Sequence, residues 1–157
     1  MKKLLLLVFA PILILSACSK NEATSVDPVK QAAVDEAAIK AYIAADTSIH
    51  ATRDPSGLYY QIIKPGTGNN PTSKSVITAN YTGKLLNGTT FDSGTITKAS
   101  LAGGLIQGWS IGIPYSKVGG RILLIIPSAL GYGPSSPGAA IPANSVLVFT
   151  IDLLGFQ

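Results

Sequence analysis

The dipeptide Asn87-Gly88 lies between two extended segments and constrains the fold of this chain more than any other feature. In residues 76–86 the odd-numbered positions are mainly apolar and the even-numbered positions from 78 to 84 are polar. Such alternation is typical of a strand with one buried face. Asn-Gly favours a hairpin, because a type I′ turn needs two residues that tolerate positive φ. We therefore expect a partner strand over residues 89–92, followed by an irregular stretch over residues 93–104.

Glycine and proline divide the rest of the chain into short segments. Sixteen glycines and ten prolines stand mainly between short apolar runs, which favours many turns and short strands over long helices. Further strands are expected at residues 58–63, 121–127 and 145–154, and the second of these is apolar enough to be buried on both faces.

One short helix is expected over residues 107–113, because Pro114 limits it, and a long loop is expected over residues 130–144. These elements predict an α+β fold, in which a twisted antiparallel sheet of about five strands wraps around one short helix.

The first 17 residues have the pattern of a secretory signal peptide. Lys2 and Lys3 precede an apolar run over residues 4–15 that is too short to span a bilayer comfortably, and small residues follow it. Leu15-Ser16-Ala17-Cys18 resembles a bacterial lipobox, which implies that the Cys18 thiol is acylated and becomes the new N-terminus. The alternative is an ordinary signal peptide that contains a cysteine. Several acyl chains together would anchor the protein stably to a membrane.

Residues 18–57 are expected to form a tether and an N-terminal helix. Asp27 and Pro28 have the residue types of an N-cap and a first helical position, and the helix is expected to continue to about residue 45. Its expected apolar stripe consists of Val29, Ala33, Ala37, Tyr42 and Ile43. Packing on the domain, dimerisation and a spacer role remain open for this helix. A turn at residues 55–57 is expected to mark the boundary of the main domain, residues 58–157.

The chain holds one cysteine and one histidine, which limits its chemistry. A single cysteine excludes a disulfide framework and a cysteine-cluster metal site. His50 has no second histidine for a metal centre and no obvious partner for nucleophilic catalysis, so we expect a surface residue, no metal and no cofactor. Without Lys2 and Lys3, ten basic residues stand against eight acidic ones and are scattered, which argues against a nucleic-acid partner.

The segment Leu105-Ile106-Gln107-Gly108-Trp109 carries the only tryptophan. The glycine before it permits a tight backbone turn, and an indole ring dominates the burial energetics of whatever it contacts. A lone tryptophan in a small domain is most simply a core residue. The other interpretation is that Trp109 forms the floor of an apolar pocket.

Seven short runs follow one another at defined intervals within residues 58–157. They are Tyr81-Thr82-Gly83-Lys84-Leu85, Gly88 with Phe91-Asp92-Ser93, Leu105-Ile106-Gln107-Gly108-Trp109, Val118-Gly119, Leu130-Gly131-Tyr132-Gly133, Ile141-Pro142, and Leu147-Val148-Phe149. Their order and spacing resemble those of the FKBP-type peptidyl-prolyl cis/trans isomerases. The resemblance implies a twisted antiparallel sheet wrapped on a short helix, and an isomerase of X–Pro bonds. It implies nothing certain about residues 19–57.

The resemblance also implies roles for individual residues. The implied catalytic residues are Tyr81, Phe91, Asp92, Trp109, Tyr132 and Phe149, and the implied substrate-binding residues are Leu105, Ile106 and Ile141. Trp109 would lie under the proline ring, while the Ile106 N–H and the Tyr132 hydroxyl would hold the substrate backbone. Asp92 would lie beside the pocket as a polar partner. From the residues alone, Tyr81 and Phe149 are equally well explained as core aromatics, and Asp92 as a turn residue.

Two positions depart from the family's pattern. Ala99 stands near a position where the family often has an aromatic residue, so that wall is expected to be thinner or rebuilt by Leu101. Pro137 stands in the long loop where some members have a histidine. Both departures bear on substrate preference and on the affinity for macrolide inhibitors more than on the basic activity.

The expected function combines the pocket with the leader. An apolar pocket that binds a twisted X–Pro imide better than either planar isomer accelerates exchange without a nucleophile. We expect an isomerase that assists the folding of exported, proline-containing polypeptides, with the family's macrolide inhibitors as further ligands. Its expected location is the bacterial cell envelope, lipid-anchored at the outer membrane and facing the periplasm or the cell surface. The alternatives are a peptide-binding chaperone or docking module with little turnover, and an inert anchored protein.

Overall fold

The structure is a computed structural model that describes residues 27–157, so the expected signal peptide, the lipidation site Cys18 and most of the tether lie outside the described residues. The elements in chain order are α1 (Pro28–Ala45), β1 (Thr52–Arg53), β2 (Tyr59–Lys64), β3 (Val76–Leu85), β4 (Thr90–Ser100), α2 (Gln107–Gly112), the 3-10 helix η1 (Ile113–Tyr115), β5 (Arg121–Ile126), the 3-10 helix η2 (Ser128–Leu130) and β6 (Leu147–Phe156).

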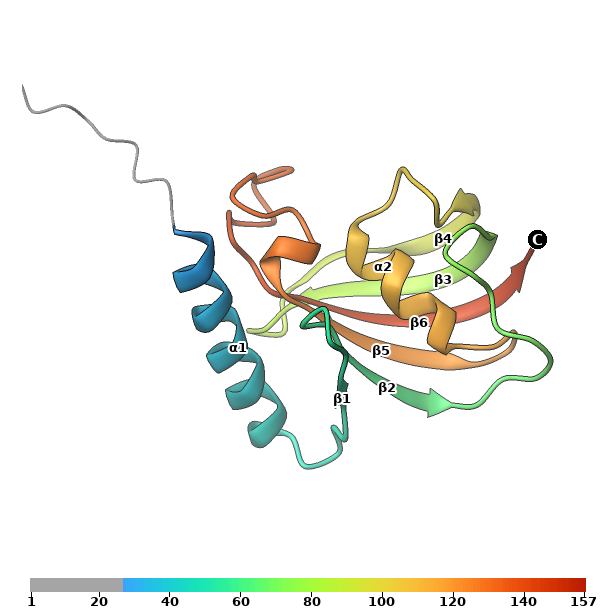
Figure 1. Cartoon of the computed structure of the whole chain (residues 1–157), viewed down its shortest axis with the longest axis horizontal. Helices are drawn as coiled ribbons and strands as arrows, with labels where there is room; N and C mark the ends of the chain where they lie inside the picture. The colour runs from blue at the N-terminus through green and yellow to red at the C-terminus, as the bar shows by residue number, and fades with distance from the viewer. Residues whose placement is uncertain (1–26) are drawn as a thin grey trace, which may run out of the picture.

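The strands form one sheet in the order β1-β2-β5-β6-β3-β4, and every neighbouring pair is antiparallel. The short helix α2 lies over one face of this sheet, and α1 lies beside one end of it (Figure 1). The expected α+β architecture is confirmed, with six strands instead of about five. The additional strand, β1, has only two residues and pairs only with β2. A strand this short is too short to show an alternating pattern in the sequence.

Strand β4 is longer than the sequence predicts. The expectation of an irregular stretch over residues 93–104 is wrong up to Ser100, because β4 continues to that residue and pairs with β3 as far as Val76. This edge strand is rich in threonine and serine and mostly exposed, so it lacks the apolar alternation that marks a strand. Main-chain pairing with β3 holds it, and that pairing does not depend on side-chain type.

The turn between β3 and β4 is not the type I′ turn that Asn87-Gly88 suggests. Gly88 has φ +87°, but Asn87 does not adopt positive φ. The Asn87 side chain instead accepts the N–H of Thr89 at 3.0 Å, and the Leu85 N–H donates to the Thr89 carbonyl at 2.9 Å. The hairpin prediction is therefore confirmed, while the turn type is wrong: a glycine in the left-handed region closes a longer connection.

The sheet is buried on both faces where β5 crosses it. Ile122, Leu124 and Ile126 join the main cluster under α2, while Leu123 and Ile125 join a second cluster with α1. This confirms the expectation that residues 121–127 form a strand without a solvent-exposed face. The main cluster positions α2, and therefore Trp109, directly over the centre of the sheet.

Helix α1 begins as expected, since the Asp27 carboxylate accepts the Val29 N–H at 2.9 Å and Pro28 follows it. The expected apolar stripe is wrong in its first part, because Val29 is 78% exposed. It is confirmed at its end, where Tyr42 and Ile43 pack against the second cluster. The fully buried positions are Asp35 and Ile39, which the stripe did not include, and Ile39 belongs to the same cluster.

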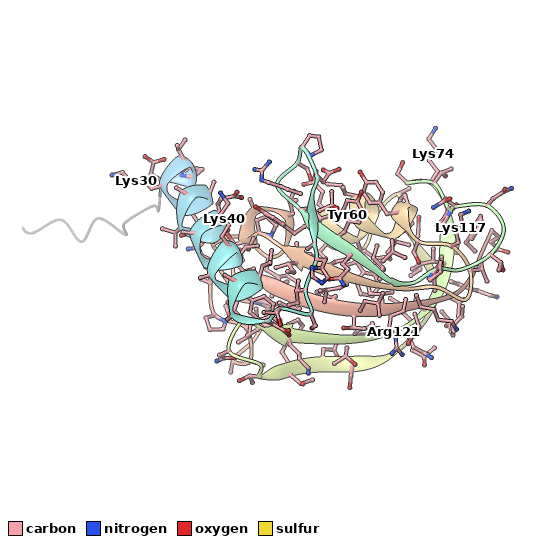
Figure 2. The ribbon with its side chains drawn as sticks, turned by 90° about the horizontal axis from the view of Figure 1, so that it is seen from below. Lys30, Lys40, Tyr60, Lys74, Lys117 and Arg121 are labelled. Carbon is pink, nitrogen blue, oxygen red and sulfur yellow. The ribbon has the colours of Figure 1, made fainter. Side chains whose placement is uncertain are left out.

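Charged side chains are distributed over the described surface. Lys30 and Lys40 lie on α1, Lys74 and Lys117 lie at the opposite end of the molecule, and Arg121 lies at the sheet, where it pairs with Asp152 at 2.7 Å (Figure 2). His50 is exposed, as expected. None of the helices in residues 27–157 combines the length and the apolar character that crossing a membrane requires.

Candidate active site

A cavity of about 480 Å³ opens between α2, strands β3 and β4, the start of β6 and the chain after η2. Its lining residues are Tyr81, Asp92, Ile96, Gly104, Leu105, Ile106, Gln107, Trp109, Gly131, Tyr132 and Phe149. The volume falls within the range of about 300–1,000 Å³ that is usual for ligand pockets. Seven of the nine residues expected at the site therefore line one cavity, although they come from distant parts of the chain.

Three aromatic rings build the base of this cavity. The Trp109 ring meets Phe149 at 5.3 Å between ring centroids and 89° between ring planes, and it meets Tyr81 at 5.4 Å and 76°. Edge-to-face contacts of this kind are favoured by the ring quadrupoles. The three rings form a firm apolar surface, because each one limits the rotation of its neighbours.

Trp109 satisfies both interpretations that the sequence left open. Its residue is only 4% exposed and belongs to the main cluster, yet its ring lines the cavity. Within residues 27–157, its indole N–H is buried without a hydrogen-bond partner. An unpaired buried donor is costly, so the packing around the ring must offset the cost of this N–H.

Gly108 serves close packing and not the tight turn that the sequence suggested. It lies inside α2, where a Cβ atom would approach the Ile126 side chain to 2.5 Å. Gly112, one turn later, would place a Cβ atom 2.6 Å from Leu124. Two glycines on the same face therefore let α2 approach β5 closely and seat Trp109 deep in the fold.

Asp92 is joined to the pocket wall through Tyr81. The Tyr81 hydroxyl donates to the Asp92 carboxylate at 2.8 Å. This hydrogen bond, together with burial, raises the pKa of the Tyr81 phenol. The phenol therefore stays protonated through the neutral range and holds the carboxylate at the rim of the cavity.

Tyr132 is presented by the loop after η2. The Ser128 carbonyl accepts the N–H groups of Gly131 at 2.9 Å and Gly133 at 2.8 Å, so the residues before and after Tyr132 are both held by one acceptor. The Tyr132 residue is 37% exposed and lines the cavity. Its hydroxyl is thereby available at the open side of the pocket.

Leu105 and Ile106 form the rim where α2 begins. Ile106 is the N-cap of α2, and its carbonyl accepts the Trp109 N–H at 3.0 Å. The first four N–H groups of a helix, counted from the N-cap, have no partner within the helix. The Ile106 N–H is one of these donors, and its residue lines the cavity.

Phe91 and Ile141 lie next to the main cavity and not in its lining. They line an adjoining hollow of about 210 Å³, which shares Asp92 and Tyr132 with the main cavity and also includes Pro137. Phe91 supports the base from behind, with its ring 5.5 Å from that of Phe149 at 84°. Ile141 is buried and belongs to the main cluster, so it supports the loop from within.

Four lining residues were not expected from the sequence: Ile96, Gly104, Gln107 and Gly131. Ile96 is the informative one, because it supplies the wall that the small Ala99 leaves incomplete. Leu101, expected to rebuild that wall, is fully buried in the main cluster and does not line the cavity. Ile96 was missed because residues 93–104 were expected to be irregular. If β4 had been expected to continue along β3, Ile96 would have been placed in the strand, where it pairs with Ala79.

The cavity combines an aromatic base with polar groups. In residues 27–157, no group of three or more His, Cys, Asp or Glu side chains could hold a metal ion. The polar residues of the lining are Tyr81, Tyr132, Gln107 and Asp92, whose carboxylate is already bonded to Tyr81. Such a site can bind and orient an amide, but it lacks a histidine or cysteine for covalent catalysis.

Comparison with known proteins identifies the family of this chain. The family model of the FKBP-type peptidyl-prolyl cis-trans isomerases matches residues 68–154, which is more than half of the chain. The chain belongs to this family. The match begins before β3 and ends within β6, so it contains every residue that lines the FKBP-type cavity.

Individual relatives agree with the family match. The chain is 35% identical over 142 residues to the FKBP-type peptidyl-prolyl cis-trans isomerase FkpA of Aeromonas hydrophila, covering 87% of this chain and 52% of the relative. The crystal structure of FkpA from Escherichia coli has a TM-score of 0.65 at 33% identity. The match covers 82% of this chain and 62% of the FkpA chain. The crystal structure of a peptidyl-prolyl cis-trans isomerase from Pseudomonas syringae has a TM-score of 0.68 at 26% identity. The match covers 85% of this chain and 98% of the isomerase.

The chain spans about half the length or less of several curated relatives. It covers 52%, 28% and 58% of the first three, which are longer proteins. The part that they share with this chain includes the FKBP-type domain.

Proposed function

We propose that this chain catalyses the cis/trans isomerisation of X–Pro peptide bonds in polypeptide substrates. The observation that carries the proposal is the open cavity with an aromatic base that includes Trp109, with Tyr132 and Ile106 in its lining and no histidine or cysteine there. Membership of the FKBP-type family supports the same reaction.

The proposed mechanism relies on differential binding. The X–Pro barrier of about 18–20 kcal/mol comes from the partial double bond of the planar amide. At the top of the barrier the amide is twisted, its carbonyl has lost resonance, and an apolar surface tolerates it better. A cavity that binds this twisted form more tightly than either planar form lowers the barrier, and each ~1.4 kcal/mol of that preference gives a factor of ten in rate.

The proposed roles follow the geometry of the cavity. The rings of Trp109, Tyr81 and Phe149 hold the proline ring in place, with Phe91 packed behind them. The Tyr132 hydroxyl and the Ile106 N–H hold the substrate backbone on either side. We assign Asp92 a supporting role, because its carboxylate is engaged by Tyr81. Leu105 and Ile141 shape the rim and the adjoining hollow.

We further propose that the substrates are exported proteins and that the chain is anchored to the cell envelope through a lipid on Cys18. The support is the sequence of the leader, Leu15-Ser16-Ala17-Cys18 after an apolar run. Under this proposal the domain faces the periplasm or the cell surface from the outer membrane. Metabolic labelling with a fatty-acid analogue tests it: wild type should be labelled and Cys18→Ser should not.

Exchange spectroscopy on a Xaa-Pro peptide tests the isomerase. The wild-type chain should raise the cis/trans exchange rate at catalytic concentrations, and Tyr132→Phe should lower kcat/KM by about fivefold through loss of a hydrogen bond to substrate. If wild type binds the peptide and suppresses aggregation of an unfolded protein without faster exchange, the domain is a peptide-binding chaperone and the isomerase proposal is wrong.

A further inference from the structure

We propose that Asp35, on the N-terminal helix α1, is a positioning residue for the loop that carries Tyr132 at the cavity. The inference rests on the proposed isomerase function, since Tyr132 is the group through which Asp35 would act. Asp35 lies outside the residues matched by the family model, 68–154, and it does not line the cavity. It is separated from its loop partner by 93 residues of sequence.

The Asp35 carboxylate is a buried acceptor shared by α1 and η2. Its residue is only 2% exposed. Oδ2 accepts the backbone N–H of Ser128 at 2.8 Å and the Ser128 hydroxyl at 2.7 Å, while Oδ1 accepts the Gln31 side-chain amide at 2.7 Å. A buried carboxylate is costly without donors, and hydrogen bonds to a charged acceptor are stronger than neutral ones. The two bonds from Ser128 therefore fix it against α1, while the bond from Gln31 holds the carboxylate in place within the helix.

Ser128 transmits this attachment to Tyr132. Its carbonyl accepts the N–H groups of Gly131 and Gly133, the two neighbours of Tyr132. The Gly133 carbonyl in turn accepts the Asn144 N–H at 2.7 Å, which closes the loop. A continuous set of hydrogen bonds thus runs from the Asp35 carboxylate through Ser128 to the N–H groups of the two glycines that flank Tyr132.

The loop needs such support because its own sequence supplies little. Two glycines flank Tyr132, and glycine loses more conformational freedom on ordering than any other residue. The Tyr132 ring is partly exposed, so packing alone does not fix it. Small displacements of a positioning group can cost large factors in rate.

Helix α1 has a second attachment that supplies a matched control. Glu36, the next residue, accepts the Tyr59 hydroxyl at 2.8 Å and pairs with Arg53 at 3.2 Å and Lys40 at 3.1 Å. These contacts hold α1 to β1 and β2 without involving the Tyr132 loop. Glu36→Gln therefore weakens the docking of α1 while it leaves the Asp35–Ser128 link in place.

The experiment is a double-mutant cycle on the full chain, with a proline peptide as substrate. Asp35→Ala should lower kcat/KM about fivefold in wild type but less than 1.5-fold in a Tyr132→Phe background, because its effect passes through the Tyr132 hydroxyl. Asp35→Asn keeps one acceptor oxygen and should recover part of the loss. Glu36→Gln should leave kcat/KM unchanged.

Amide hydrogen exchange by NMR gives a readout that does not depend on catalysis. The amides of Gly131 and Gly133 should exchange faster in Asp35→Ala and Asp35→Asn and at the wild-type rate in Glu36→Gln. Unchanged protection in both Asp35 variants, or an equal loss of kcat/KM with and without the Tyr132 hydroxyl, would overturn the inference. If the wild-type chain shows no exchange catalysis, the proposed function fails, and the protection of these two amides still decides whether Asp35 holds the loop.

Discussion

At the scale of single residues, Trp109 shows that a core residue and a pocket floor are compatible roles. Its ring packs edge-on against Tyr81 and Phe149, so little of it is exposed while one side still faces the cavity. Replacing it removes core packing and pocket surface together. An experiment on this residue therefore needs a second core variant that changes packing alone.

The pocket should work without a titrating group in the neutral range. The cavity lining includes no histidine, cysteine or lysine, and the hydrogen bond to Asp92 raises the pKa of the Tyr81 phenol, which keeps it protonated. We expect kcat/KM for a proline peptide to vary less than about twofold between pH 6 and pH 9. A bell-shaped profile with a midpoint near pH 7 would show that a proton transfer contributes.

The sequence predicted most of the residues that line the cavity, because the family's short motifs carry them. It did not separate the main cavity from the adjoining hollow, so Phe91 and Ile141 were expected in the same lining as Trp109. For the wall near Ala99 it predicted either a thinner wall or one rebuilt by Leu101, and it did not consider Ile96. Ile96 lies in β4, and the length of β4 is set by main-chain pairing with β3, which side-chain types do not reveal.

At the scale of elements, the approach of α2 to β5 decides how deep the pocket floor lies. Gly108 and Gly112 face β5 on successive turns, and added Cβ atoms would meet Ile126 and Leu124 well inside contact distance. The sequence suggested a turn at Gly108, because glycine has a flexible backbone and stands here before the bulky Trp109. Only the packing partner on β5 reveals the requirement for a small residue.

Gly108→Ala should lift α2 from the sheet. Overpacking costs about 1–3 kcal/mol, and the better helix propensity of alanine offsets about 1 kcal/mol of it, so we expect a net loss of up to about 2 kcal/mol in the free energy of unfolding. Urea denaturation measures this loss, and kcat/KM should fall with it because Trp109 is the next residue.

Gly103→Ala is the matched control for this substitution. A Cβ atom at Gly103 meets no atom within 4 Å, and its φ is not positive. Its stability and activity should stay close to wild type. Equal effects of the two substitutions would mean that the contact between α2 and β5 does not set the position of the pocket floor.

At the scale of the whole molecule, carboxylates join segments that are distant in sequence. Glu36 ties α1 to β1 and β2, Asp54 accepts the Tyr115 hydroxyl at 2.6 Å, and Asp152 binds Arg121 across β5 and β6. The sequence did not indicate these links, because a single acidic residue in a polar segment carries no motif that identifies its distant partner. The Glu36 link and the second cluster, which includes Ile39, together attach α1 to the sheet.

Asp54 should make the fold sensitive to acid. Hydrogen bonds from Ser56 and Tyr115 lower the pKa of its carboxyl in the folded state. Because the folded pKa lies below the unfolded value of about 3.9, the stabilisation is present above that value and is lost as pH falls through the folded pKa. Asp54→Asn should therefore reduce the free energy of unfolding at pH 7, and its difference from wild type should shrink near pH 3.

Urea denaturation at the two pH values measures this difference. Tyr115→Phe removes one of the donors and should give a smaller change of the same sign. A difference between wild type and Asp54→Asn that stays constant from pH 7 to pH 3 would contradict a role for the ionised carboxylate.

The most direct test of the proposed reaction is the catalysed exchange rate of a Xaa-Pro peptide with Trp109→Ala, compared with Ile113→Ala. Ile113 is fully buried in the same cluster and does not line the cavity, so it controls for lost packing. With both variants shown to be folded by amide NMR spectra, we expect Trp109→Ala to lower kcat/KM at least about tenfold and Ile113→Ala less than about twofold. A wild-type exchange rate in folded Trp109→Ala would contradict a pocket that acts through its apolar floor.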